Sequence, residues 1–211
     1  MHKKLLISLT FGALLLGISA CGSSEQTSQA VETKEKEHSE QEVKKKNFKE
    51  EKGDSTRGSH SNPIAINEVV TVDDVIPNND SEKSQKIKAE ISIPEVIRGN
   101  QAYEILKQKD QVNRPAPEGK EWVLIKVKGK LVDAEPKDFI YLLDDSYFEL
   151  VSKENQVYDD SQHAITPNPL PKEIYKDAEV EGYVSKLVNV GDEFMIRFET
   201  YEHKYKFFKS K

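Results

Sequence analysis

Residues 122–132 alternate between apolar and polar side chains, and this pattern constrains the fold more than any other feature. The apolar positions are Val123, Ile125, Val127 and Leu131, and the polar positions between them include Lys126, Lys128 and Lys130. A period of two is typical of a β-strand with one buried face. Gly129 falls on the buried face, where a glycine indicates a bulge or close packing against a large neighbour. We therefore expect this segment to be a strand of a β-rich core.

The same pattern recurs in shorter segments along the second half of the chain. Further strands are predicted at residues 86–93, 147–151, 157–158, 180–184, 194–198 and 205–208. Pro94 is expected to end the first of these strands, because proline has no N–H to donate to a neighbouring strand. The turn at residues 153–156 predicts a hairpin, and the turn at residues 189–192 separates two more strands.

One segment has helical spacing instead. Ala102, Ile105 and Leu106 recur at three and four residues within residues 99–109, and Asn100 is available as an N-cap. Pro115 prevents the helix from continuing. Many short strands joined by turns indicate a two-sheet sandwich. The predicted fold is therefore an all-β sandwich with one short helix, which we expect to cross the open end of the sandwich.

The first twenty residues have the features of a secretory signal peptide. Lys3 and Lys4 are followed by an apolar run from Leu5 to Ile18 that ends in small residues before Cys21. The run is about fourteen residues long, whereas a membrane-spanning helix needs roughly twenty. We therefore expect residues 1–20 to be a signal peptide that is removed after Ala20.

The segment Ile18–Ser19–Ala20–Cys21 also resembles the lipobox of bacterial lipoproteins. The resemblance implies that the Cys21 thiol carries a diacylglyceryl group and that Cys21 becomes the new N-terminus. Two acyl chains hold a protein on a membrane where a single chain does not. The alternative is an ordinary secretory signal with Cys21 merely near the cleavage site. Because Cys21 is the only cysteine, a lipid there leaves no thiol for a disulfide, a metal site or a nucleophile.

Composition divides the rest of the chain near residue 63. Residues 22–62 contain nine acidic and eight basic residues and a single aromatic residue, Phe48. Such a segment cannot bury enough apolar surface to fold, so we expect a disordered tether that spans about 35 Å. Residues 63–211 have 28 acidic and 21 basic residues, a net charge of −7. This charge argues against nucleic acid or an anionic membrane face as a partner. The predicted organisation is a signal peptide, a lipidated Cys21 with its tether, and one folded domain.

Several segments of the folded domain are similar in sequence and order to the DUF4352-type immunoglobulin-like domain of bacterial lipoproteins. The matching segments are residues 98–107, 113–117, 118–127, 148–150 and 181–184. The resemblance implies an immunoglobulin-like β-sandwich on the extracytoplasmic face of a Gram-positive cell membrane. It carries no catalytic residues. The chain departs from the family pattern in a long proline-rich loop at residues 159–177, where a role specific to this protein is expected.

Residues that could carry chemistry are few. The candidates are Asp144, Asp145, Asp159 and Asp160 as oxygen ligands for Ca²⁺, His163 as a general base, and Ser146 and Ser161 as nucleophiles. No EF-hand spacing is present, and neither serine lies in a nucleophile elbow. Aspartate in loops commonly bonds to its own backbone. We therefore predict no metal site, no cofactor and no catalytic residues.

Aromatic residues suggest a binding role only if they gather on one surface. Trp122 is expected at the edge of the core, although it could also stack on a glycan. The tyrosines near the predicted loops are Tyr141, Tyr147, Tyr158 and Tyr175. We expect a non-catalytic binding module, anchored to the membrane through Cys21, whose partner is a protein or a wall component. A Ca²⁺-dependent or enzymatic accessory domain, or a binder of a small ligand or wall glycan, is the alternative.

Overall fold

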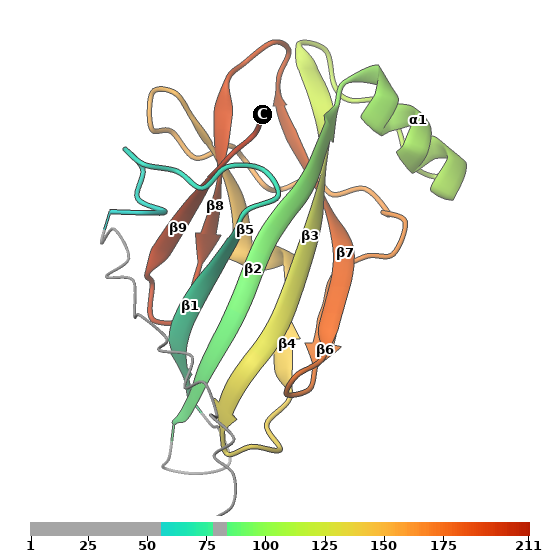
Figure 1. The fold of residues 1–211 in the computed structure, drawn as a ribbon. Coiled ribbons are helices and arrows are strands. Elements are labelled where there is room, and N and C mark those ends of the chain that lie inside the picture. The colour runs from blue at the N-terminus through green and yellow to red at the C-terminus, as the bar shows by residue number, and fades with distance from the viewer. Residues whose placement is uncertain (1–55, 78–83) are drawn as a thin grey trace, which may run out of the picture. The chain divides into compact units, whose positions relative to one another are not determined.

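The computed structural model describes residues 56–77 and 84–211, and Figure 1 shows how their strands are arranged. The elements are β1 (Val69–Ile76), β2 (Gln85–Arg98), α1 (Asn100–Lys109), β3 (Lys120–Glu135), β4 (Tyr141–Leu143), the 3₁₀ helix η1 (Asp145–Tyr147), β5 (Phe148–Ser152), β6 (Lys172–Ile174), β7 (Glu179–Asn189), β8 (Phe194–Glu199) and β9 (Tyr205–Lys209). The predicted signal peptide, Cys21 and most of the predicted tether lie outside the described residues.

The strands form two antiparallel sheets that pack face to face. One sheet has the order β1-β2-β3-β7 and the other has the order β5-β8-β9, while β4 and β6 form a separate pair. In Figure 1 the four-stranded sheet lies in front of the three-stranded sheet. The predicted all-β sandwich with one short helix is confirmed.

The core lies between the two sheets and is lined by the apolar positions of the alternating strands. Val123, Ile125 and Val127 of β3 are fully buried there, as the period of two predicts. Gly129 continues the same row. A Cβ atom added at Gly129 would lie 2.6 Å from Cδ2 of Leu143, so a large neighbour occupies the space that a side chain would need. The predicted close packing at this glycine is confirmed.

Strand β2 is longer than predicted, because it continues past Pro94 to Arg98. The pairing of β2 with β1 ends at Ser92, and the register of β2 against β3 shifts between Ser92 and Glu95. Proline is tolerated in a sheet at such an irregularity, where no ladder hydrogen bond is lost. The prediction that Pro94 ends the strand was therefore wrong.

Helix α1 lies on the outer face of the four-stranded sheet rather than across the open end of the sandwich. Its buried residues Ala102 and Leu106 pack with Trp122, Leu124 and Leu187, whose side chains point away from the inter-sheet core. The N-cap also differs from the prediction. Gly99, with φ of 68°, precedes the helix, and no side chain caps it. The predicted position of the helix and the predicted Asn100 cap were both wrong.

The folded region includes residues that the sequence analysis assigned to the tether. The N–H of Phe207 donates to the carbonyl of Gly58, and the N–H of Ile64 donates to the carbonyl of Phe207. Ile64 is buried in the core. This segment covers the outer edge of β9, and residues 56–62 therefore belong to the folded part of the chain.

Candidate functional site

Three of the four aspartates singled out in the sequence gather around one lysine. Asp144 and Asp145 lie between β4 and β5, and Asp160 lies in the loop after β5. Nζ of Lys186, in β7, lies 2.5 Å from Oδ2 of Asp160 and interacts electrostatically with Asp144 and Asp145. Together with His163 we call these residues the Lys186 cluster. The two loops meet around an ammonium group.

Lys186 is buried because of its place in β7. It pairs with Val123 in the register of β3, and its neighbours on the same strand face, Val184 and Val188, belong to the inter-sheet core. Only 4% of its side chain is exposed, against 37% for Asp160. The stem therefore lies among apolar side chains, and the ammonium group reaches the Asp160 carboxylate.

The electrostatic environment shifts the pKa values of the two neighbouring aspartates, Asp144 and Asp145, in opposite directions. Burial and the Asp144 carboxylate raise the pKa of Asp145, while Lys186 and His163 act against this rise. For Asp144, burial raises the pKa, but hydrogen bonds from Ser146 outweigh it and the net pKa is lowered. Because two close carboxylates repel each other when both are ionised, Asp145 holds its proton more tightly than an isolated aspartate does.

The cluster does not have the composition of a cation site. Within residues 56–77 and 84–211, no group of three or more His, Cys, Asp or Glu side chains has an arrangement that could hold a metal ion. The positive charge of the Lys186 ammonium beside Asp160 would repel a cation there. Asp159 lies apart from Lys186 and accepts hydrogen bonds from Ser161, as turn aspartates do.

The loop between β5 and β6 runs along the edge of β7 that no other strand of its sheet pairs with. The N–H of Ala164 donates to Oγ of Ser185, and the N–H of Tyr183 donates to the carbonyl of Asn168. Nδ2 of Asn168 donates to the carbonyl of Glu181. An uncovered sheet edge invites pairing with other chains, and this loop prevents such pairing along β7.

The aromatic residues do not gather on one surface. Trp122 is buried against α1, as expected for a core-edge residue, and its Nε1 donates to the carbonyl of Arg114. Tyr141 is buried and stacks on Tyr147 in the core, whereas Tyr158 donates to Oδ2 of Asp192. Tyr175 is exposed. The four tyrosines therefore offer no common contact surface.

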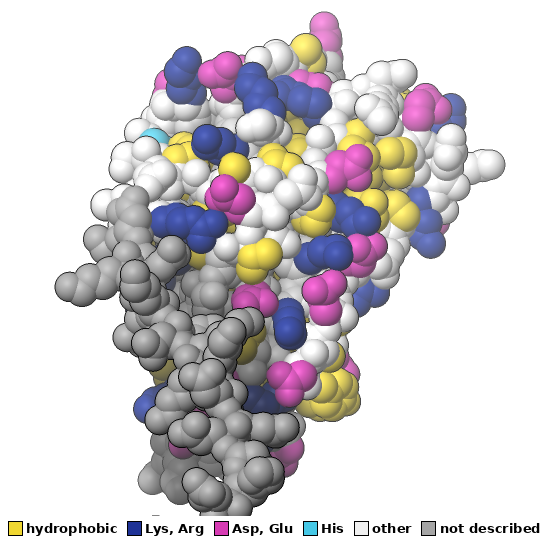
Figure 2. Space-filling model, viewed as in Figure 1, with side chains coloured by type: hydrophobic (Ala, Val, Ile, Leu, Met, Phe, Trp, Pro, Cys, Tyr) yellow, Lys and Arg dark blue, Asp and Glu magenta, His cyan; other side chains and the backbone are white. Residues whose placement is uncertain are grey.

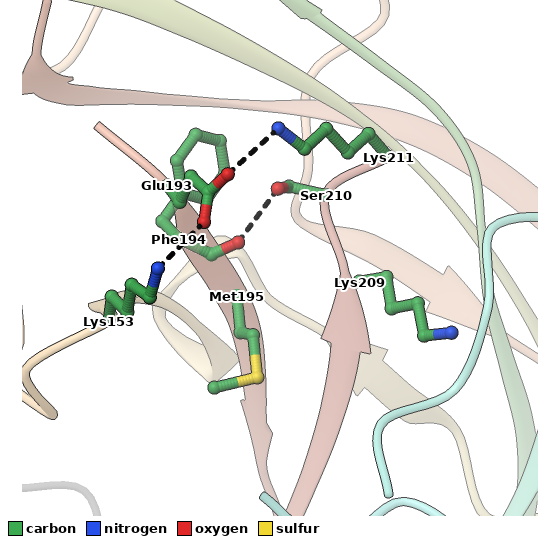
Figure 3. A pocket seen from close by; sticks show the side chains of 7 residues that line it. All are labelled: Lys153, Glu193, Phe194, Met195, Lys209, Ser210 and Lys211. Carbon is green, nitrogen blue, oxygen red and sulfur yellow. Dashed lines mark hydrogen bonds and ion pairs between the residues drawn. The ribbon is translucent and has the colours of Figure 1, made fainter. Parts of the chain in front are cut away.

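A hollow of about 290 Å³ lies where β8 and β9 approach the end of the chain. Its lining residues are Lys153, Glu193, Phe194, Met195, Lys209, Ser210 and Lys211, and we call it the C-terminal hollow. Figure 3 shows Lys153 and Lys211 approaching Glu193 from opposite sides. The lining combines apolar side chains of β8 with three lysines and one glutamate. The lining therefore has more positive than negative side chains, and they lie beside the apolar side chains of Phe194 and Met195.

The opposite side of the molecule has a different character. Figure 2 shows basic and acidic side chains interspersed over the outer face of the four-stranded sheet. Lys126 pairs with Glu181, and Lys128 pairs with Glu179. Because cations and anions alternate there, this face lacks the local charge excess of the C-terminal hollow.

Sequence reasoning identified the acidic half of the Lys186 cluster but missed its centre. Lys186 follows a run in which Val180, Gly182 and Val184 alternate, so its inward position could have been deduced from the period of two. The sequence gives less indication of the C-terminal hollow. Lys209 and Lys211 are close in sequence, but only the pairing of β5, β8 and β9 brings Lys153 to them.

Comparison with known proteins gives two partial structural similarities. Neither a family model nor a curated protein sequence matches the chain. The candidate lipoprotein YcdA of Bacillus subtilis is similar over 57% of this chain and 35% of its own length, with 15% identity and a TM-score of 0.42. The YjhA protein of Bacillus subtilis is similar over 70% of this chain and 99% of its own, with 9% identity and a TM-score of 0.45.

The chain therefore spans about a third of the length of YcdA. Membership of the DUF4352 family remains a prediction from the sequence. Among residues 56–77 and 84–211, no helix combines the length and apolar character needed to cross a membrane.

Proposed function

We propose that this chain is a lipid-anchored protein of the extracytoplasmic membrane face whose sandwich is a non-catalytic binding module. The observation that carries the proposal is the single Cys21, placed after Ile18–Ser19–Ala20 at the end of the apolar run. A cysteine in this position is the substrate for lipid attachment, and two acyl chains give stable membrane binding. The folded domain then works beside the membrane.

The C-terminal hollow is the binding surface that the charges favour. Lys153 and Lys211 pair with the one acidic lining residue, Glu193, and Lys209 adds a third cation to the lining, although the domain as a whole carries more acidic than basic residues. Phe194 and Met195 supply an apolar floor beside these cations. Complementary charge steers a partner to the surface that it fits. We infer that the module binds an anionic component of the cell envelope.

Binding is tested with the full chain carrying Cys21→Ala and with short-chain inorganic polyphosphate as the anionic probe. In an NMR titration, we expect chemical-shift changes at Met195 and Ser210 that weaken as salt screens the charges. The double variant Lys153→Glu/Lys211→Glu should abolish them. The matched control is Lys128→Glu, on the outer face of the four-stranded sheet, which should leave the chemical-shift changes as they are in the wild type. Shifts that persist in the double variant would overturn this assignment.

Anchoring and binding are tested together by crosslinking on intact cells, followed by mass spectrometry. We expect the native chain to capture an envelope component that the Lys153→Glu/Lys211→Glu variant does not capture. The Cys21→Ala chain, released from the membrane, should lose the capture because its local concentration falls. Equal capture by the native chain and both variants would contradict the proposed function.

A further inference from the structure

Lys186 differs from every other lysine that forms an ion pair in the described part of the chain. The side chains of the others are between 25% and 77% exposed, whereas that of Lys186 is 4% exposed. Removing a charged amine and its carboxylate from water is costly unless further hydrogen bonds compensate. Lys186 and Asp160 are therefore in contact with the amine side chain almost wholly shielded from water.

The Asp160 carboxyl is incompletely satisfied by this contact. Its Oδ2 receives Lys186 Nζ at 2.5 Å, while its Oδ1 is the one buried side-chain nitrogen or oxygen without a hydrogen-bond partner among the described residues. Nδ1 of His163 lies 4.0 Å from Oδ1, beyond hydrogen-bond distance. An ion pair that served stability alone would be expected to satisfy both oxygens.

We propose that Lys186 and Asp160 are the reactants of an intramolecular amide crosslink between β7 and the loop after β5. The amine and the carboxyl group are held in contact by two separate parts of the fold. No other chemical group is consumed. This crosslink does not depend on the binding role proposed above.

The reaction is a condensation that balances without a co-reactant. Lys186 gives up a proton, and the free amine attacks Cγ of the protonated Asp160 carboxyl group. A C–N bond forms, a C–O bond of Asp160 breaks, and the departing oxygen leaves as water with two protons. An ammonium and a carboxylate thus become an amide and one water molecule, and no electrons are gained or lost.

Contact between the reactants overcomes the excess of water that would otherwise favour hydrolysis. Groups held in reactive geometry reach effective molarities of roughly 10⁵–10⁸ M. The exposed fraction of Asp160 gives the departing water a path to solvent. Within the proposal, the proton passed between the reactants is relayed by Asp145, whose carboxyl group interacts electrostatically with Lys186.

The crosslink would give this protein an internal covalent link, which a disulfide cannot provide here. The chain has one cysteine and therefore no internal disulfide. An amide between residues 160 and 186 would close a loop that fixes the edge-covering segment on β7. A covalent link that closes a loop stabilises a fold mainly by restricting the unfolded chain.

Peptide mapping of the full-length chain tests the proposal directly. Trypsin cuts after Lys186 only if its amine is free, which gives peptides 177–186 and 187–197. With the crosslink, peptide 154–172 remains joined to an uncut peptide 177–197, and their combined mass is lower by one water. We expect the joined peptide from the folded wild type. Complete cleavage after Lys186 in that protein would overturn the proposal.

The chain supplies its own control at Lys176 and Asp133. Their Nζ and Oδ1 atoms are 2.6 Å apart, but the side chains are 31% and 65% exposed, so this pair should remain unlinked. Asp160→Ala and Lys186→Arg should abolish the joined peptide. Asp160→Asn, unlike Asp160→Ala, should still form the joined peptide, because its side-chain amide reacts with the amine and releases ammonia in place of water. A simple ion pair would not give this result.

The role of Asp145 is tested by the rate at which the joined peptide accumulates. Asp145→Asn should slow its formation at least tenfold, and Asp145→Glu should recover the rate. An unchanged rate in Asp145→Asn would remove Asp145 from the proposal. If a variant fails to fold, the wild-type peptide map still decides whether the crosslink exists.

Discussion

At the scale of single residues, Gly129 is a core position that leaves no room for a side chain. A Cβ atom there would lie 2.6 Å from Leu143 and 3.3 Å from Ile174. We expect Gly129→Ala to lower the free energy of unfolding by about 1–3 kcal/mol, because overpacking forces neighbours out of their preferred positions. Urea denaturation measures the change. Lys130→Ala, on the opposite face of the same strand, should change stability by less than about 0.5 kcal/mol.

Glu121 links three elements and makes stability depend on pH. Burial raises its pKa, but the Arg98 guanidinium and the N–H of Gly191 outweigh this effect, so the pKa lies below its usual value of 4.5. The stabilisation is therefore complete above pH 4.5 and is lost as the pH falls through the folded-state pKa. We expect Glu121→Gln to be less stable than wild type at pH 7, and the difference to shrink at lower pH. A constant difference in urea midpoints across this range would contradict the assignment.

Individual residues also show which features the sequence can predict. Gly129 was placed correctly because its position follows from alternation along one strand, and Trp122 was placed correctly because it starts that strand directly after a turn. Lys186 obeys the same alternation, yet a lysine inside a strand is normally assigned to a solvent-facing position. Its burial depends on the carboxylates that two distant loops bring to it. Such contacts are set by tertiary structure, which the local pattern does not contain.

At the scale of elements, Asn113 joins the end of α1 to the loop that covers β7. Its Nδ2 donates to the carbonyls of Leu106 and Ile165, and its Oδ1 accepts from the N–H of Ile165. We expect Asn113→Ala to cost about 1–3 kcal/mol, because it leaves buried backbone groups unpaired. Hydrogen exchange should rise first at Ile165. Gln111→Ala, at an exposed position of the same connection, should leave this exchange unchanged.

The elements that sequence reasoning missed share a physical cause. Strand β1 went unpredicted because Asp73 and Asp74 interrupt the alternation. Asp74 nevertheless occupies a buried position, where it accepts hydrogen bonds from the N–H groups of Tyr201 and Glu202. Strands β4 and β6 have three residues each, too few to show a period. Local patterns identify long strands with apolar faces, whereas short or polar strands depend on partners far away in sequence.

At the scale of the whole molecule, the two sheets present different outer surfaces. The four-stranded sheet is covered by α1 over one part and by paired charges over another. The three-stranded sheet borders the C-terminal hollow, with its lysines and apolar floor. A binding module needs one surface that differs from the rest, and this asymmetry is why the hollow is assigned that role.

The anchor is the feature that gives this asymmetric domain a fixed place in the cell. We expect Cys21→Ala to move the protein from the membrane fraction to the medium, because no acyl chains remain to be buried at about 0.8 kcal/mol per methylene. Fractionation followed by detergent phase separation measures the shift. Ser23→Ala, two residues away, should stay in the detergent phase with the wild type. If Cys21→Ala also remains there, the membrane contact lies in another part of the chain, and the lipid on Cys21 is not the anchor.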